Sequence, residues 1–564
     1  MSFNRRTFLK SLSAVAVLPA AFQESQAAVN TTLFPLGVMA GDMAATSSTT
    51  AKAILWTHYT GTAPLYLVVW EAATGGATVF NAQVTIGTAG YTLKDVTTLK
   101  PGVRYYYYFY VKDSLGNITS QSDTGRFRTP IAPGTREVLV FGGTSCTHQS
   151  FAASGFPVLQ NAAYKELDCF FHLGDHVYQD GSSTLGQFRA QYKVNWQADG
   201  MRSLHRRSGL YATWDDHEYV NNWDPEWVAR TSGQSTILAN ARQTFFEHHP
   251  IRRNTAAPDR IWRSFKWGDT AEFFLLDLRS ERYPSRSQYI SRAQLDALKN
   301  GLKSSTAVFK FILTPVPVST FPSADPYAYD RWEGYHAQRT EILSWIRDMH
   351  LTGVWWLAGD YHMGSVGHLE EYGYQWYGMR EVLMGAGGNG GYVEGPQQMA
   401  GSAQWDFSTA QNNYFLYTAD PVAQTLRVTC YAAGGTLLFD RTYPATFVPG
   451  GLSVSGAIGT KYNQSGMVGL LGKPLTSEHG TYGGAGSWQQ FQYGYIYWHP
   501  DTGAHEIHGA ILDRWADEGW SQSYLGYPAT DEYGVGTAGD REQEFQFGFI
   551  RWYASTATTE IFWK

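Results

Sequence analysis

The segment FFHLGDHVY, residues 170–178, gives the strongest indication of the fold of this chain. The apolar run that enters it is typical of a buried strand, and its polar end carries Asp175 and, three residues on, Tyr178. Three other apolar runs end in the same way: residues 137–141 lead to Cys146, residues 210–213 to Asp216 and His217, and residues 353–358 to Asp360 and His362. Short continuous apolar runs fit strands that are covered on both faces. Because ligands gather at the carboxyl ends of strands in open α/β sheets, we expect these side chains to meet and form a two-metal site.

The composition indicates several packed domains. The chain has 564 residues, of which 43% are apolar and 15% aromatic, so more than one domain with a well-packed core is expected. A formal net charge of −6 gives no basic footprint, which argues against specific nucleic-acid recognition. Three cysteines do not make a disulfide framework. Cys169 and Cys430 lie in apolar runs and are expected to be buried, whereas Cys146 is expected in a loop after a strand.

The first residues, 1–27, have the pattern of an export signal. A charged start, NRRTFLK at residues 4–10, precedes a short apolar stretch and a small-x-small end at residues 25–27. The apolar stretch is too short to anchor the chain in a bilayer. The paired arginines resemble the twin-arginine signal, which implies the twin-arginine machinery as a partner and a location in the periplasm, in the cell envelope or outside the cell. The alternative is a general secretion signal that contains two arginines.

Two regions of different pattern follow the signal. Residues 28–134 hold apolar or alternating runs at short spacing, separated by turn residues, and they resemble fibronectin type III-like modules, so we expect a β-sandwich there. In residues 135–449 strands alternate with helical stretches, which predicts a layered α/β sandwich.

The motifs of the second region resemble a known family in their order along the chain. GDxxY at residues 174–178, WDDHE at 214–218, NN at 221–222 and GDxH at 359–362 look like the PhoD-type alkaline phosphatases, within the calcineurin-like metallophosphoesterases. FPLGVMAGD at residues 34–42, DLR at 277–279 and RWEGY at 331–335 are similar to that family too. The resemblance implies a four-layer α/β metallophosphoesterase sandwich, a ferric ion beside one or two calcium ions, and hydrolysis of phosphate esters outside the cytoplasm.

The expected metal ligands follow from donor chemistry. Asp175 is the best bridging ligand because a carboxylate can span two cations. Tyr178 as phenolate and Cys146 as thiolate favour a trivalent ion, and His362 completes that sphere. The carboxylates of Asp175, Asp216 and Asp360 suit a second ion such as calcium, magnesium or manganese. Either Asn221 or Asn222 can add an amide oxygen, or both can cap a turn.

Two residues are expected to act on the substrate. His217 lies between acidic residues, so it suits a general acid or a cation that stabilises the transferred phosphoryl group, with a scaffold role beside Asp215 as the alternative. Arg279 can hold a phosphate oxygen, or it can form a structural ion pair with Asp277. Two metals roughly 3.5–4 Å apart would acidify a water and direct the hydroxide at phosphorus.

The last segment, residues 467–564, repeats itself. LGxP at residues 471–474 recurs at 525–528, and FxxGxIxW at 491–498 recurs at 545–552, so both steps equal 54 (525 − 471; 545 − 491). These motifs resemble LGFP repeats, which implies a β-rich module and association with cell-envelope glycans. A linker is expected at residues 450–466.

Three functions fit these observations. We favour an exported metallophosphatase that acts on phosphomonoesters and on phosphodiesters. A phosphodiesterase or phospholipase D-type hydrolase, acting on polymers or lipids, is the nearest alternative. A cell-wall-binding protein with an inactive enzyme-like domain is the third, and the intact set of expected ligands argues against it.

Overall fold

The structure is a computed structural model. It describes residues 30–72, 76–321, 330–349, 351–370, 376, 378–445, 454–476, 478–481, 485–536 and 538–564. The expected export signal at residues 1–27 lies outside this part of the chain. Among the described residues, the helices are too short or too polar to cross a membrane.

The N-terminal region contains a five-stranded antiparallel sheet. Its strands are β3 (Leu65–Glu71), β4 (Thr78–Val84), β6 (Arg104–Lys112), β7 (Ile118–Gln121) and β8 (Gly125–Arg128). In β6 the side chains of Tyr105, Tyr107 and Phe109 are buried, and they alternate with more exposed neighbours. This period of two is the pattern of a strand with one face in a core.

A ten-stranded sheet joins the N-terminal region to the centre of the molecule. Its order is β22-β21-β20-β9-β10-β11-β1-β2-β5, with the short strand β18 (Ala386–Gly388) paired to β9. The bounds are β1 (Val38–Ala45), β2 (Ala51–His58), β5 (Tyr91–Leu99), β9 (Leu139–Thr147), β10 (Cys169–Leu173), β11 (Gly209–Thr213), β20 (Asn413–Asp420), β21 (Thr425–Ala432) and β22 (Leu437–Pro444). β9, β10, β11 and β1 are parallel. The N-terminal strands β1, β2 and β5 thus continue the central sheet across the boundary expected at residue 134.

A seven-stranded sheet packs against the large one. Its order is β12-β13-β14-β15-β17-β16-β19. The bounds are β12 (Arg263–Trp267), β13 (Ala271–Leu275), β14 (Phe309–Thr314), β15 (Val354–Ala358), β16 (Gly364–His368), β17 (Arg380–Leu383) and β19 (Trp405–Thr409). Buried aromatic rings fill the space between the two sheets: Phe273 lies 5.1 Å from Phe141 and 4.6 Å from Phe171 between ring centroids. Edge-to-face and tilted contacts of this kind stabilise the layer beyond simple burial.

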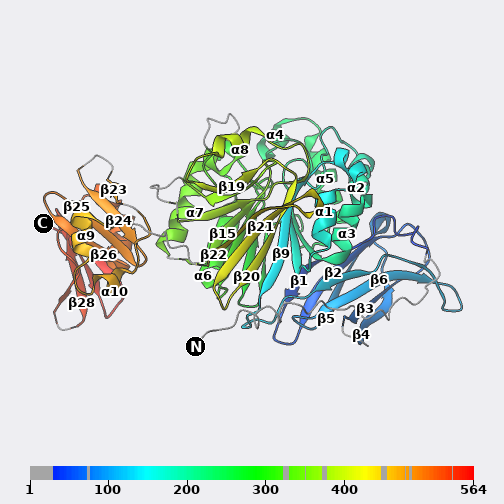
Figure 1. Cartoon of the computed structure of the whole chain (residues 1–564), viewed down its shortest axis with the longest axis horizontal. Coiled ribbons are helices and arrows are strands. Elements are labelled where there is room, and N and C mark those ends of the chain that lie inside the picture. The colour runs from blue at the N-terminus through cyan, green and yellow to red at the C-terminus, as the bar shows by residue number, and fades with distance from the viewer. Residues whose placement is uncertain are drawn as a thin grey trace, which may run out of the picture.

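Helices cover the outer faces of both sheets, which gives the expected four-layer α/β sandwich (Figure 1). The helices are α1 (Pro157–Ala163), α2 (Leu185–Gln197), α3 (Asp199–Arg207), α4 (Pro225–Arg230), α5 (Gln234–His248), α6 (Arg292–Ser304), α7 (His336–Asp348) and α8 (Glu394–Met399). Against the large sheet, Phe170 packs with Trp196 of α2 and Met201 of α3. Against the second sheet, Ile312 packs with Leu295 of α6.

The C-terminal module repeats one unit. Each unit has a four-stranded antiparallel sheet. The strands are β23 (His479–Gly480), β24 (Ser487–Phe491), β25 (Gly494–His499), β26 (Gly503–His508), β27 (Tyr533–Val535), β28 (Asp540–Glu544), β29 (Gly548–Tyr553) and β30 (Thr558–Trp563), and the helices are α9 (Gly456–Tyr462), α10 (Met467–Leu471) and α11 (Gly509–Asp517). The bridge between Pro474 and Phe491 recurs between Pro528 and Phe545, so the sequence repeat is also a structural repeat.

Helix α9 lies in the segment expected to be a linker, residues 450–466. Its Ile458 is fully buried beside Leu471 and Phe491. The small residues of this segment suggested a linker, but residues 456–462 form a packed helix. The C-terminal module therefore begins before residue 467.

The module contacts the central domain near α7 (Figure 1). The Arg347 guanidinium of α7 lies 5.6 Å from the ring centroid of Trp520. A cavity of about 270 Å³ is lined by Trp355 and Met379 on one side and by Gln490 and Tyr493 on the other. The module is therefore joined to the central domain by side-chain contacts as well as by the chain between them, which the prediction of a linker did not include.

Candidate metal centre

Four strands deliver the expected ligands to one place. Cys146 lies near the end of β9, Asp175 follows β10, Asp216 follows β11, and Asp360 and His362 follow β15. Cys146 was expected in a loop, but β9 extends through it because β18 pairs alongside, with Ala386 opposite Ser145 and Gly388 opposite Thr147.

Backbone strain concentrates at these ligands. The φ angles of Cys146, Asp175, Asp360 and His362 are 56°, 55°, 76° and 50°, in the left-handed region that non-glycine residues rarely enter. Such conformations cost about 1–3 kcal/mol each and persist where the surrounding structure enforces them, often at functional sites. Gly174 has φ 94°, and a Cβ there would lie 2.5 Å from Cβ of Asp215. The close approach of the β10 and β11 ends thus requires this glycine.

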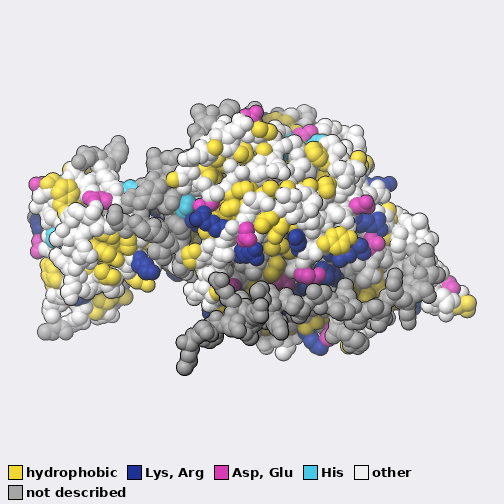
Figure 2. Space-filling model, viewed as in Figure 1, with side chains coloured by type: hydrophobic (Ala, Val, Ile, Leu, Met, Phe, Trp, Pro, Cys, Tyr) yellow, Lys and Arg dark blue, Asp and Glu magenta, His cyan; other side chains and the backbone are white. Residues whose placement is uncertain are grey.

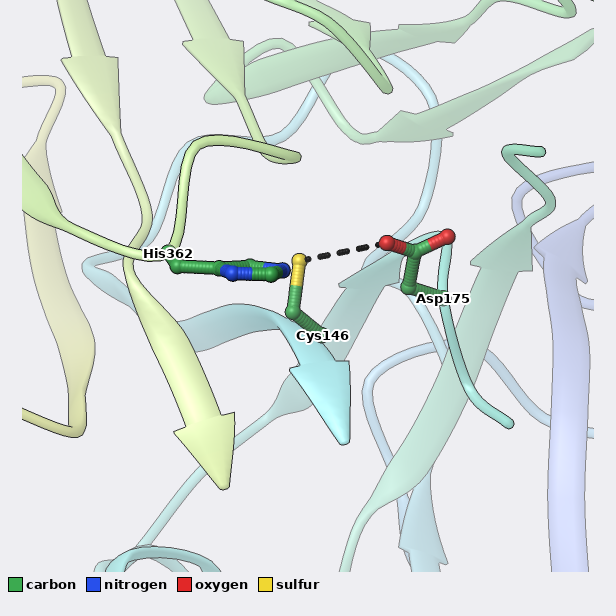
Figure 3. A group of neighbouring side chains, drawn as sticks. All are labelled: Cys146, Asp175 and His362. Atoms are coloured by element: carbon green, nitrogen blue, oxygen red, sulfur yellow. Dashed lines mark hydrogen bonds between the residues drawn. The ribbon is translucent and has the colours of Figure 1, made fainter. Parts of the chain in front are cut away.

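The first group of ligand atoms joins the thiol of Cys146, a carboxyl of Asp175 and the imidazole of His362 (Figure 3), and the phenol of Tyr178 lies beside them. Cys146 Sγ lies 3.5 Å from Asp175 Oδ2. Tyr178 Oη lies 3.0 Å from the same Asp175 oxygen and 2.8 Å from His362 Nε2. These four side chains converge on one point, as their expected roles require.

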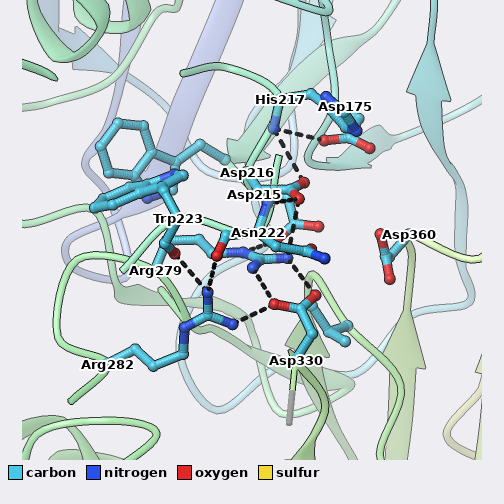
Figure 4. Close-up of polar contacts among 12 residues, drawn as sticks. Asp175, Asp215, Asp216, His217, Asn222, Trp223, Arg279, Arg282, Asp330 and Asp360 are labelled. Atoms are coloured by element: carbon cyan, nitrogen blue, oxygen red, sulfur yellow. Dashed lines mark hydrogen bonds and ion pairs between the residues drawn. The ribbon is translucent and has the colours of Figure 1, made fainter. Parts of the chain in front are cut away.

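The second group is a set of carboxylates (Figure 4). Ligand atoms of Asp175, Asp215, Asp216 and Asp360 all lie within 4.8 Å of one another, and a third group joins Asp175, Asp216 and His217 in the same way. Asp175 belongs to all three groups. It therefore occupies the position that a bridging ligand needs.

The electrostatics of the cluster call for added positive charge. Burial, together with Asp216 and Asp215, raises the pKa of Asp175 well above its ordinary value, and burial with Asp215 does the same to Asp360. Burial also raises the pKa of the Cys146 thiol and of the Tyr178 phenol, each with help from Asp175. Buried anions that lack counter-charge are costly, and two cations would supply that charge.

His362 is suited to bind a metal. Burial, with His217 nearby, lowers its pKa to about 4. Its imidazole is therefore neutral near pH 7, as a metal ligand must be.

His217 is held by a carboxylate outside the cluster. Its Nδ1 lies 2.5 Å from Asp180 Oδ2, and its ring centroid is 4.1 Å from that of Tyr178. Burial opposes the charged form, but Asp216, Asp175 and Asp180 raise the pKa of His217 to about 11. The imidazolium is the favoured form, and the partner that orients it is Asp180 rather than Asp215.

Arg279 does not fit the expected role of a phosphate clamp. Its side chain is fully buried. Nε lies 2.6 Å from Asp215 Oδ1, NH1 lies 2.6 Å from Asp330 Oδ1, and NH2 is 3.7 Å from Asp216 Oδ2. Because its nitrogens pair with carboxylates, the Arg279 guanidinium supplies positive charge on the buried side of the acidic cluster. The alternative, a side-chain ion pair with Asp277, is also wrong, since Asp277 accepts from the backbone N–H of Arg279.

Of the two candidate asparagines, Asn222 lies at the cluster. Its backbone N–H donates to Asp216 Oδ2 at 2.6 Å, and its side-chain amide lies between Asp216 and Asp330, with nitrogen distances of 3.1 Å and 3.0 Å in one orientation. The backbone N–H of Asn221 instead donates to Asp180.

Some residues of the site were missed from the sequence. They are Asp180, Asp215, Asp330 and Asn389. Asp215 lies inside the motif WDDHE and Asp330 directly precedes RWEGY, so their place in or beside these motifs was the available signal. Asn389 stands in a glycine-rich run, and only packing brings it to Tyr178.

Family models match three parts of the chain. Residues 139–386 match the family model of the PhoD-like phosphatase, and residues 19–131 match that of the PhoD-like phosphatase N-terminal domain. The chain carries a PhoD-like phosphatase domain. Residues 471–523 match the LGFP repeat.

Relatives extend the match beyond the family models. Alkaline phosphatase D of Bacillus subtilis (strain 168) is 27% identical over 439 residues, which are 65% of this chain and 73% of that protein. A solved structure of PhoD shares the fold with a TM-score of 0.62 at 19% identity, over 90% of this chain and 96% of the other. Purple acid phosphatase from yellow lupin (Lupinus luteus) seeds has a TM-score of 0.50 at 12% identity, over 72% of this chain and 73% of the other.

The PhoD-like phosphatase domain makes the chain a metal-dependent phosphoric ester hydrolase. The clustered donors fit that chemistry, because a buried set of carboxyl, thiol, phenol and imidazole groups that share one aspartate is arranged to hold cations.

Proposed function

We propose that this chain is an exported phosphatase that hydrolyses phosphomonoesters and also phosphodiesters. The observation that carries the proposal is the presence of Asp175 in all three groups of potential ligands. A shared carboxylate is the simplest way to hold two cations close enough to act on one phosphoryl group.

The two groups of donors differ in chemistry, and we propose that they hold different ions. Cys146, Asp175, Tyr178 and His362 would hold Fe(3+), because a thiolate and a phenolate beside one ion favour a trivalent cation. Asp175, Asp216 and Asp360 would hold Ca(2+), a cation that prefers oxygen ligands. The amide oxygen of Asn222 is the proposed addition to this second set, in the orientation of the amide that turns its oxygen rather than its nitrogen toward Asp216 and Asp330.

When bound, the ions would supply Lewis acidity and neutralise charge on the phosphoryl oxygens. His217 acts on the substrate in our proposal: its imidazolium, oriented by Asp180, donates a proton to the leaving alkoxide or balances charge on the phosphoryl group. Arg279 has a supporting role, since it holds Asp215 and Asp216 from the buried side.

Location forms a separate part of the proposal. The segment at residues 1–27 would direct export by the twin-arginine machinery, and the LGFP repeats would hold the enzyme at envelope glycans. On the face drawn in Figure 2, basic and acidic side chains lie interspersed. Nucleic-acid-binding proteins usually gather basic side chains in one patch or stripe. The mixed charges on this face therefore favour a different class of substrate.

A substrate panel tests the activity. Purified full-length protein is stripped of metal, reloaded with ferric iron, with calcium or with both, and assayed on p-nitrophenyl phosphate and on bis-p-nitrophenyl phosphate. We expect hydrolysis of both esters only when both ions are restored. Full activity with either ion alone would contradict the two-ion proposal, and cleavage of the diester alone would favour a phosphodiesterase.

A further inference from the structure

Asn389 lies against two of the proposed iron ligands. Its side-chain nitrogen is 2.5 Å from Tyr178 Oη and 3.1 Å from His362 Nε2. No sequence motif marked this residue. Its position therefore needs an explanation of its own.

The orientation of the amide is fixed by a second contact. The backbone N–H of Gly390 donates to the side-chain oxygen of Asn389 at 2.7 Å. The oxygen end is thereby satisfied, so the end that faces the phenol carries the N–H groups. The backbone N–H of Asn389 itself donates to Asn412 Oδ1 at 3.1 Å, which ties the residue to a neighbouring loop.

The glycine-rich run around Asn389 places it by close packing. Strand β18 ends at Gly388, which pairs opposite Thr147 on β9. A Cβ on Gly388 would lie 2.4 Å from the Phe156 ring, and one on Gly391 would lie 2.0 Å from the carbonyl oxygen of Ala410. Side chains at these positions would push the loop away from Tyr178, so the glycines act to keep the amide in place.

The partners of the phenol leave room for this donor. Tyr178 Oη donates to Asp175 Oδ2 at 3.0 Å, and a phenol oxygen that donates once can still accept. A phenolate bound to a cation likewise keeps a lone pair for an N–H donor. Such contacts around metal ligands fix their orientation and tune the metal.

We infer that Asn389 is a positioning residue of the proposed ferric site: its amide fixes the Tyr178 oxygen and, by donating a hydrogen bond to it, weakens electron donation from that oxygen to the ion. The inference rests on the proposed function, because it needs Tyr178 to bind iron. Removal of the donor raises the energy of the phenolate electrons, so charge transfer to ferric iron needs less energy.

Visible spectra of the full-length protein loaded with ferric iron test this inference. Asn389→Leu removes the donor, and Asn389→Asp keeps the shape of the side chain but presents an ionised acceptor. We expect the phenolate-to-iron band to move to longer wavelength in both variants. Gly390→Ala is the control, because a Cβ there meets nothing within 4 Å, and its band should stay at the wild-type wavelength.

The spectra distinguish a failure of the role of Asn389 from a failure of the proposed iron site. A band that is present in the wild type and lost in Tyr178→Phe, yet unmoved in both Asn389 variants at equal iron content, overturns the role of Asn389 alone. Iron-loaded wild-type protein without any band that depends on Tyr178 overturns the proposed iron site, and the inference falls with it.

Discussion

Tyr178 Oη and His362 Nε2 lie 2.8 Å apart although 184 residues separate them in the chain. Tyr178 follows β10 of the ten-stranded sheet, and His362 follows β15 of the seven-stranded sheet. The contact therefore exists only because the two sheets pack with their carboxyl ends side by side. A ligand set divided between two sheets ties metal binding to the integrity of the sandwich.

Replacement of Asp175 tests the shared ligand. Asp175→Asn removes a charge from all three groups of ligand atoms, so we expect turnover to be abolished and both ions to be depleted in elemental analysis. Asp296→Asn, at the surface of α6, is the matched control and should keep both. Near-normal activity in Asp175→Asn would show that the catalytic metal site lies elsewhere in the chain.

Leaving-group dependence tests the role of His217. A general acid contributes about 10²–10⁴-fold, and the contribution is largest for alkoxide leaving groups. His217→Ala should therefore lose about that factor on alkyl phosphates, much less on 2,4-dinitrophenyl phosphate, and should retain its metals.

His148 offers a matched control for this variant. Its ring centroid lies 4.6 Å from that of Tyr178, but its Nδ1 contacts only Ser150 among the polar partners described. His148→Ala should show the same small change on every ester. An equal loss on all esters in His217→Ala would instead assign His217 to the scaffold.

The strand ends could be predicted from the sequence for a simple physical reason. Continuous apolar runs such as those before Asp175 and Asp360 are buried strands, and polar residues at their ends must lie at one edge of a sheet. The fold class and the proximity of the expected ligands follow from that pattern. The roles of those ligands stay predictions.

Contacts between distant segments could not be predicted in the same way. The motif DLR suggested Asp277 as the partner of Arg279, yet its partners are Asp215, 64 residues away, and Asp330, 51 residues away. Asn389 meets Tyr178 across 211 residues. Side-chain direction at such distances depends on packing, which residue spacing does not encode.

Stability measurements separate the two roles considered for Arg279. In Arg279→Met the carboxylate of Asp215 loses its buried partner and Asp330 keeps only Arg282, and breaking a buried ion pair costs about 3–5 kcal/mol. We expect a large drop in the urea unfolding midpoint. Arg427→Met, which removes the exposed pair with Asp440, should change the midpoint little. A normal midpoint with only a raised KM would restore the phosphate-clamp role.

Truncation tests the C-terminal module. The described metal-ligating groups all lie before it, so a chain that ends near residue 450 should hydrolyse small esters at about the full-length rate. It should bind isolated envelopes less and unfold at a lower temperature, because Trp355 and Met379 lose the cover of Gln490 and Tyr493. Equal envelope binding by both proteins would contradict the attachment role, and loss of small-ester turnover would make the module part of the catalytic unit.

Elemental analysis combined with a visible spectrum of active full-length protein tests whether Tyr178 and Cys146 hold an iron ion beside a calcium ion. We expect iron together with calcium, and a charge-transfer band that disappears in Tyr178→Phe. A colourless, fully active enzyme without iron would contradict it.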